Sequence, residues 1–260
     1  MIKGFWVILR FELFALFVSP ATYVASFYFL ALLGVGFRFF IESFVLTDWI
    51  LPPLASLVVG LVFGAPALIP FLTMRSFAEE RRLGTLETLM SAPVSNLGIV
   101  LGKWTASYLF FIFITMASFC FPLIISLWFP EQSQSLGFDK VEQWIGAFSF
   151  LLIFGASFSA VGIFASSVTN NQMVAGMLTF TLLTLYLSFM IFYFGENIEF
   201  QFFSGFAQIA WSSFGAVFGG LNKMQYFSVG IIDIPTVLYQ MVVTFYFLIL
   251  ASTQIDQVKK

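Results

Sequence analysis

Long apolar runs recur along the whole chain, and most of them are separated by short segments that contain polar and charged residues. Each run is about as long as, or longer than, the roughly 20 residues that a helix needs to cross a hydrocarbon core of about 30 Å. The runs do not alternate apolar and polar residues, so the pattern predicts spanning helices and not the strands of a membrane barrel. The predicted spans are 21–39, 54–74, 104–129, 144–168, 173–194 and 235–253.

The composition agrees with this pattern. Hydrophobic residues make up 60% of the chain and charged residues only 9%, which leaves too little polar surface for a soluble domain. We therefore expect an all-α integral membrane protein whose residues 1–260 form a single transmembrane domain with six spanning helices.

The distribution of basic residues predicts the orientation. An even number of spans places both termini on one side, and Lys and Arg near the spans accumulate in the cytoplasm. With cytoplasmic termini, only Arg38, Lys140 and Lys223 of the 11 basic residues lie outside. Both termini are therefore expected in the cytoplasm.

Residues 1–18 are predicted to form a helix at the membrane surface. Lys3 and Arg10 are seven residues apart and share one helix face, whereas Glu12 lies on another face. Arg10 and Glu12 interrupt the apolar region, and no small-residue cleavage site follows, so we do not interpret this segment as a signal peptide. Ser19 and Pro20 then separate it from the first span.

Residues 75–94 form the one sizeable cytoplasmic loop of the predicted topology, and six charges lie between Arg75 and Glu87. We expect residues 75–83 to extend the second span as a helix that Gly84 ends. Thr85 is expected to cap a second, short helix over residues 86–90, which ends before Pro93.

Two interpretations of this loop remain open. Its charges are typical of residues that mark a membrane boundary. Alternatively, exposed Leu86, Leu89 and Met90 form an apolar surface with a charged rim that inserts into a groove of a partner.

The chain lacks the residues for several kinds of chemistry. It contains no His and a single Cys, Cys120, so it has no Ser-His or Cys-His pair and no cage of thiolates for a metal. Gly98 and Gly102-Lys103 are spaced too closely for a phosphate-binding loop, and Trp104 replaces its Ser or Thr. We expect Ser95 or Asn96 to cap a helix there, with Lys103 reaching the membrane boundary. No catalytic residue, metal site, cofactor or nucleic-acid partner is expected for this chain.

Within the segment 195–234, residues 200–234 are apolar but interrupted by glycines, among them Gly205, Gly215, Gly219 and Gly220. In one interpretation residues 205–221 re-enter the outer leaflet as a short helix and turn back, since irregular backbone at that depth must be buried against protein or water. A segment lying flat at the membrane surface is the other.

The run EERRLGTLETLMSAPV over residues 79–94, followed by Gly102-Lys103, resembles the signature of ABC-2-type transporter permeases, especially the branch associated with gliding motility. The sequences SPATY at 19–23 and FSVGIID at 227–233 are also similar to that branch.

The resemblance implies a bacterial inner-membrane permease that docks on a separate ABC ATPase subunit, which binds ATP and Mg²⁺. It also implies a second permease, identical or different, and an additional periplasmic or accessory membrane protein as partners. Residues 1–18, with Lys3 and Arg10, would be the connecting helix, and residues 195–234 would line the outer exit. The residues that would couple the permease to the ATPase are Glu79, Glu80, Arg81, Arg82, Gly84, Thr85, Leu86, Glu87, Leu89, Met90 and Pro93.

The expected function is thus the membrane subunit of an ATP-driven exporter. A subunit that does not transport, but anchors a partner or transmits mechanical work to the periplasm, is the alternative. A passive channel is a third class, although the sequence shows no obvious aqueous pore.

Overall fold

The computed structural model describes residues 2–46, 53–91, 94–194, 226–227 and 230–258, and within these ranges the regular structure is helical. The helices are α1 (Ile2–Val18), α2 (Pro20–Leu46), α3 (Pro53–Thr73), α4 (Ala78–Leu83), α5 (Thr85–Ser91), α6 (Asn96–Ser118), α7 (Cys120–Trp128), α8 (Pro130–Ser135), α9 (Val141–Val168), α10 (Gln172–Phe194) and α13 (Ile234–Val258).

The prediction of six spanning helices is confirmed. In the described part of the chain, six helical stretches are long and apolar enough to cross a membrane. These are Pro20–Glu42, Pro53–Leu83, Asn96–Trp128, Val141–Val168, Gln172–Phe189 and Ile234–Gln257. The second stretch combines α3 with α4, and the third combines α6 with α7.

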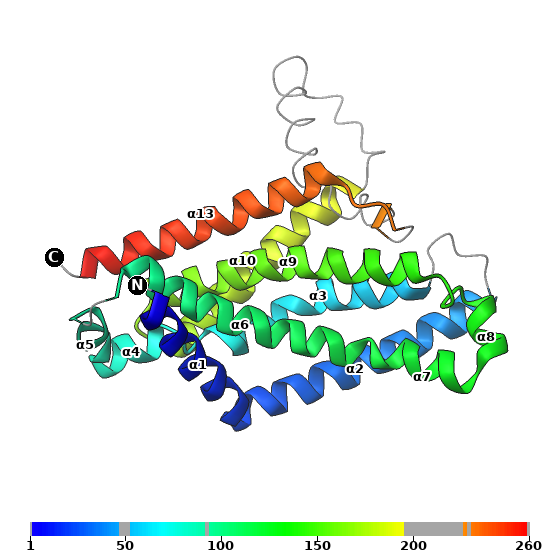
Figure 1. Cartoon of the computed structure of the whole chain (residues 1–260), viewed down its shortest axis with the longest axis horizontal. Helices are drawn as coiled ribbons and strands as arrows, with labels where there is room; N and C mark the ends of the chain where they lie inside the picture. Colours follow the sequence, from blue (N-terminus) through cyan, green and yellow to red (C-terminus); the bar gives the residue numbers. More distant parts are fainter. Residues whose placement is uncertain (1, 47–52, 92–93, 195–225, 228–229, 259–260) are drawn as a thin grey trace, which may run out of the picture.

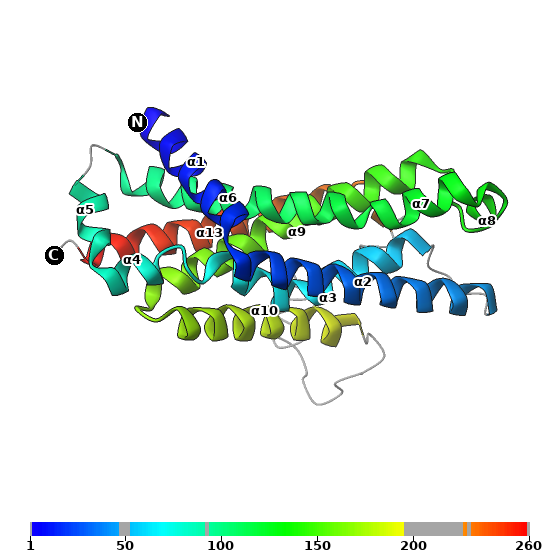
Figure 2. The same ribbon diagram turned by 90° about the horizontal axis from the view of Figure 1, so that it is seen from below.

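The spanning helices run side by side, with α9 and α3 at the centre (Figures 1 and 2). In their apolar windows 67% of α9 and 61% of α3 is buried, against 17% of α2 and 22% of α10. α9 packs against α3, α6, α10 and α13, so it is the element that joins the bundle. The outer helices α2, α10 and α13 leave large apolar faces exposed.

Part of the high Phe content fills this centre. Along α9 the rings of Phe150 and Phe154 stack with centroids 4.2 Å apart, and Phe154 meets Phe158 edge-on at 6.0 Å. All three side chains are buried. Aromatic packing adds to the dispersion contacts that hold helices together where lipid removes the hydrophobic driving force.

Both termini lie at one end of the bundle together with α4 and α5, whereas α7 and α8 lie at the other end (Figure 1). This agrees with an even number of spans. The first helix also ends where the sequence predicts, because Ser19 interrupts the chain between α1 and α2.

Helix α1 packs obliquely across the beginning of α6 (Figure 2). Gly102 permits the close crossing, since a Cβ atom at this position would lie 3.0 Å from Cγ2 of Ile8. The crossing brings the middle of α1 next to Lys103.

Candidate functional site

Lys103, in the second turn of α6, is the most deeply buried charged residue of the described chain, with 1% of its side chain exposed. Its Nζ donates hydrogen bonds to Oε1 of Glu80 at 2.8 Å and to the carbonyl oxygen of Ser76 at 2.7 Å. The third bond goes to Oε1 of Glu12 in α1. An ammonium has three donors, so every donor of Lys103 is used.

These contacts define the Lys103 cluster, formed by Glu12, Glu80 and Lys103. The ring of Phe77 contributes a cation–π contact, with its centroid 5.1 Å from Nζ. When all three groups are ionised, two carboxylates face one ammonium, and the cluster has a net charge of −1. Oε2 of Glu80 has no hydrogen-bond partner among the described residues. The cluster therefore depends strongly on its single cation.

The sequence-based interpretation of Lys103 was wrong. We expected its side chain to reach the membrane boundary, but the crossing of α1 and the end of α3 enclose it. Glu12 was not predicted as part of a site at all. The available signal was an acidic residue within an apolar helix, because such residues are costly unless they are paired.

The junction between α3 and α4 also differs from the prediction. Residues 74–77 form a turn, so α3 does not continue as one helix to residue 83. Ser166 of α9 stabilises this turn, since its Oγ accepts hydrogen bonds from the backbone N–H groups of Phe77 at 3.0 Å and Ala78 at 3.2 Å. The same hydroxyl donates to the carbonyl oxygen of Met74 at 3.3 Å. One buried side chain thus satisfies donors that the start of α4 leaves unpaired.

The predicted corner at Gly84 is confirmed. Gly84 ends α4 in the left-handed region with φ of 70°, and its N–H donates to the carbonyl oxygen of Arg81 at 3.2 Å. The short helix α5 follows at once. Helix α5 begins at Thr85 itself, one residue before the predicted start, and the Thr85 hydroxyl donates to the carbonyl oxygen of Glu80 at 3.4 Å. The cap by Thr85 stays a prediction.

The apolar side chains of α5 do not form the exposed surface that we predicted. Leu86 is 2% and Met90 is 7% exposed, and both pack with Phe77 and Ile99 in the same apolar cluster. Leu89 is partly buried against that cluster. A helix of two turns buries its apolar face on the nearest apolar surface, and here that surface belongs to its own bundle.

The exposed part of this region is the corner between α4 and α5, which we call the Leu83 corner and which comprises Arg82, Leu83, Gly84 and Thr85. Leu83 is 61% exposed, and the other three residues are exposed as well. A large apolar side chain beside a charged one is therefore exposed between α4 and α5. Figure 1 shows these two helices at the end of the bundle that contains both termini.

The end of α13 attaches to the same region. Nη2 of Arg81 donates to the carbonyl oxygen of Gln254 at 3.5 Å, and Asn96 donates from its side-chain amide to Asp256. Three spans therefore bond directly to the segment formed by the end of α3, α4 and α5. They are α6 through Lys103, α9 through Ser166 and α13 through the carbonyl oxygen of Gln254.

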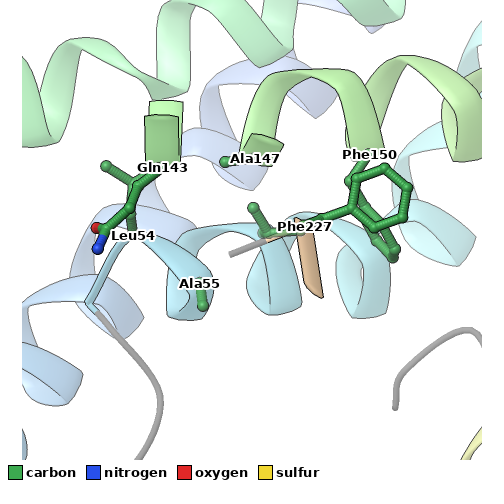
Figure 3. Close-up of a pocket in the computed structure, with 7 residues that line it drawn as sticks. Leu54, Ala55, Gln143, Ala147, Phe150 and Phe227 are labelled. Atoms are coloured by element: carbon green, nitrogen blue, oxygen red, sulfur yellow. The ribbon is translucent and has the colours of Figure 1, made fainter. Parts of the chain in front are cut away.

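A cavity of about 700 Å³ opens between α1 and the segment from α3 to α5. A second cavity, at the other end of the bundle, has only about 10 Å³, which is close to the smallest space that holds one water molecule. There Phe227 lies between α3 and α9, near Leu54, Gln143 and Phe150 (Figure 3). Of these two cavities in the described part of the chain, the larger one has room for a ligand.

Several residues named from the sequence are not part of this geometry. Arg10 is exposed on α1, away from the Lys103 cluster. Pro93 and the glycines of the outer segment, Gly205, Gly215, Gly219 and Gly220, lie outside the described residues, as do the side chains of Lys3 and Glu87.

Comparison with known proteins gives one family. The family model described as "ABC-2 family transporter protein" matches residues 2–208, more than half of the chain. The match includes every residue of the Lys103 cluster and the Leu83 corner. No curated protein matches the chain.

Proposed function

Because the chain belongs to the ABC-2 family of transporter proteins, we propose that it is the permease subunit of an exporter driven by a separate ATPase subunit. Its six spanning helices make it a multi-pass membrane protein. ATP and Mg²⁺ would bind to the ATPase, and transport would need a second permease, either identical or different. The likeness of residues 79–94 to the gliding-motility branch remains a resemblance in sequence.

The Lys103 cluster is the observation that supports this function best. It joins α4, through Glu80, to α1, through Glu12, and to α6, through Lys103 itself. A displacement of α4 that separated Glu80 from Lys103 would leave the largely buried Glu80 carboxylate without its cation, at a cost of about 3–5 kcal/mol. A force applied to α4 is therefore transmitted to α1 and α6 before the contacts separate.

The Leu83 corner is the surface on which the ATPase would act. The predicted docking surface of Leu86 and Met90 cannot serve this purpose, because both side chains are buried. An exposed leucine beside Arg82 and next to a left-handed glycine gives a compact projection, suited to a groove with an apolar floor and an acidic rim. The excess of basic residues at this end of the bundle supports the placement of this end on the cytoplasmic side of a bacterial inner membrane.

Movement of the corner would reach the centre of the bundle by a second route. The turn at residues 74–77 is bonded to Ser166 near the end of α9, the helix that contacts most of the other spans. We infer that ATP binding draws the corner toward the ATPase and that α3, α6 and α9 rearrange around the transport path.

Co-purification with the ATPase tests the docking surface. Leu83→Asp and Arg82→Glu should reduce the amount of ATPase recovered with the permease by at least about tenfold, the effect of losing roughly 1.4 kcal/mol of binding free energy. Lys140→Glu is the matched control, because Lys140 is an exposed cation near the other end of the bundle. Normal recovery of the ATPase with both corner variants would refute the assignment.

A further inference from the structure

The cavity between α1 and the segment from α3 to α5 is lined by apolar and by charged side chains, and both elements contribute to each set. We call the apolar set, which includes Phe11, Leu16 and Phe71, the apolar wall. The charged wall is the set that includes Arg75 and Glu79 together with Glu12 and Glu80 of the Lys103 cluster. Small polar side chains at Ser19 and Thr22 also contribute.

The apolar wall continues onto the outer surface of the bundle. Phe11 is 69% and Phe71 is 45% exposed, and both line the cavity. Phe14 and Val18 extend the exposed apolar face of α1. An apolar chain can therefore enter this cavity from the surrounding hydrocarbon. A soluble protein segment would not need such an apolar entrance from the membrane.

The charged wall presents groups of both signs. Arg75 donates one hydrogen bond to Oγ of Ser19 at 3.2 Å, which leaves further donors of its guanidinium for an anion. The lining residues Glu12, Glu79 and Glu80 outnumber Arg75 and the adjacent Lys103 by one charge, so the cavity favours a cation near its carboxylates. A ligand that complements this wall has a phosphate-like anion and an amine on one short headgroup.

We propose that the cavity binds a phospholipid with a primary amine in its headgroup. The phosphate is placed at Arg75 and the ammonium at Glu79, while the start of an acyl chain lies along Phe11, Leu16 and Phe71. The volume of about 700 Å³ lies within the usual range for small-molecule sites and accommodates the headgroup with part of the chains. A primary ammonium donates hydrogen bonds to a carboxylate, which a trimethylated amine does not.

A lipid in this position would contact α1 and α4 at once, beside the Lys103 cluster that already connects them. It would therefore stabilise their packing. The site is a property of this chain alone and does not depend on the proposed docking of an ATPase.

Native mass spectrometry of the delipidated full-length chain tests the site. The protein is mixed in detergent with dioleoyl phosphatidylethanolamine, phosphatidylcholine or phosphatidylglycerol, and the bound lipid is counted. We expect the ethanolamine lipid to bind about tenfold more tightly than the other two. Phosphatidylcholine has no N–H group to donate to Glu79, and phosphatidylglycerol offers only neutral hydroxyls without an ammonium to pair with that carboxylate. Glu79→Gln and Arg75→Gln should each reduce its binding by about tenfold.

The control variant is Glu131→Gln, which removes an exposed carboxylate from α8 at the other end of the bundle and should leave lipid binding unchanged. Soluble glycerophosphoethanolamine should not compete, because it lacks the acyl chain that the apolar wall binds. Equal binding of all three lipids, or ethanolamine-lipid binding that is insensitive to both Glu79→Gln and Arg75→Gln, would overturn the proposal.

Discussion

Replacing Lys103 by Met is the perturbation to which the site should be most sensitive. The substitution keeps a long, unbranched side chain in the buried position but removes the positive charge and all three hydrogen bonds of Nζ. Glu12 and Glu80 would then face each other at close range without a cation. Ser76 would lose a donor to its carbonyl oxygen.

The expected cost follows from the burial of the cluster. Lys103 is 1% exposed, and the side chains of Glu12 and Glu80 are 16% and 23% exposed, so water screens the remaining carboxylates poorly. Removing one partner of such a buried ion pair lowers the free energy of unfolding by about 3–5 kcal/mol. The triple variant Lys103→Met, Glu12→Gln, Glu80→Gln removes the unpaired charges as well and should recover most of that loss.

The assay is unfolding in mixed micelles with increasing SDS, followed by tryptophan fluorescence. The order of stability should be wild type, then the triple variant, then Lys103→Met, with Glu42→Gln as a control at an exposed ion pair on α2. If Lys103→Met were as stable as wild type, or if the triple variant were no more stable than the single one, the cluster would not be the buried ion network that we describe.

Three further predictions concern the same end of the bundle. Ser166→Ala should lower the free energy of unfolding by about 1–3 kcal/mol, because two buried N–H groups lose their acceptor; Ser126→Ala, which loses a bond within its own helix, should show almost no change in the same titration. Leu86→Asp should lower the free energy of unfolding by more than about 3 kcal/mol, because the side chain of Leu86 is buried. Leu83→Asp should leave the SDS midpoint unchanged, because the side chain of Leu83 is exposed. Equal midpoints for the two variants would contradict the assigned burial. Gly84→Ala should cost about 1 kcal/mol through backbone strain alone, since φ is 70° and its Cβ would meet no atom within 4 Å; an unchanged unfolding free energy would argue against the left-handed corner.

The spanning helices could be predicted because each depends on a local property, the length of an apolar run. The same holds for the cap by Ser95, whose Oγ accepts from the N–H of Gly98 at 3.2 Å, and for the corner at Gly84. These features require only neighbouring residues. They were therefore visible in the sequence before the packing was known.

The Lys103 cluster could not be predicted in this way. Its partners Glu12 and Glu80 are 91 and 23 residues away in sequence, and only the crossing of α1 over α6 brings them together. The orientation of α5 was also beyond local pattern, because a two-turn helix with Leu86 and Met90 on one face can direct that face toward a partner or toward its own bundle. The packed structure decides between the two, and it buries them.

Because the Lys103 cluster joins α4 to α1, we expect the two helices to move together when the ATPase acts on α4. Distances between spin labels test this expectation. Labels would replace the exposed residues Val7 on α1 and Leu83 on α4, in a Cys120→Ala background, with Lys140 as a third site beyond the far end of the helices. Because a label at Leu83 alters the docking corner, distances are measured only in complexes that are shown to retain the ATPase. In the assembled complex, nucleotide should change the distance between the labels on α4 and at Lys140 but leave the distance between the labels on α1 and α4 unchanged. In the triple variant Lys103→Met, Glu12→Gln, Glu80→Gln, nucleotide should change the distance between α1 and α4 as well. A nucleotide-dependent change between α1 and α4 in the otherwise wild-type protein would contradict the account.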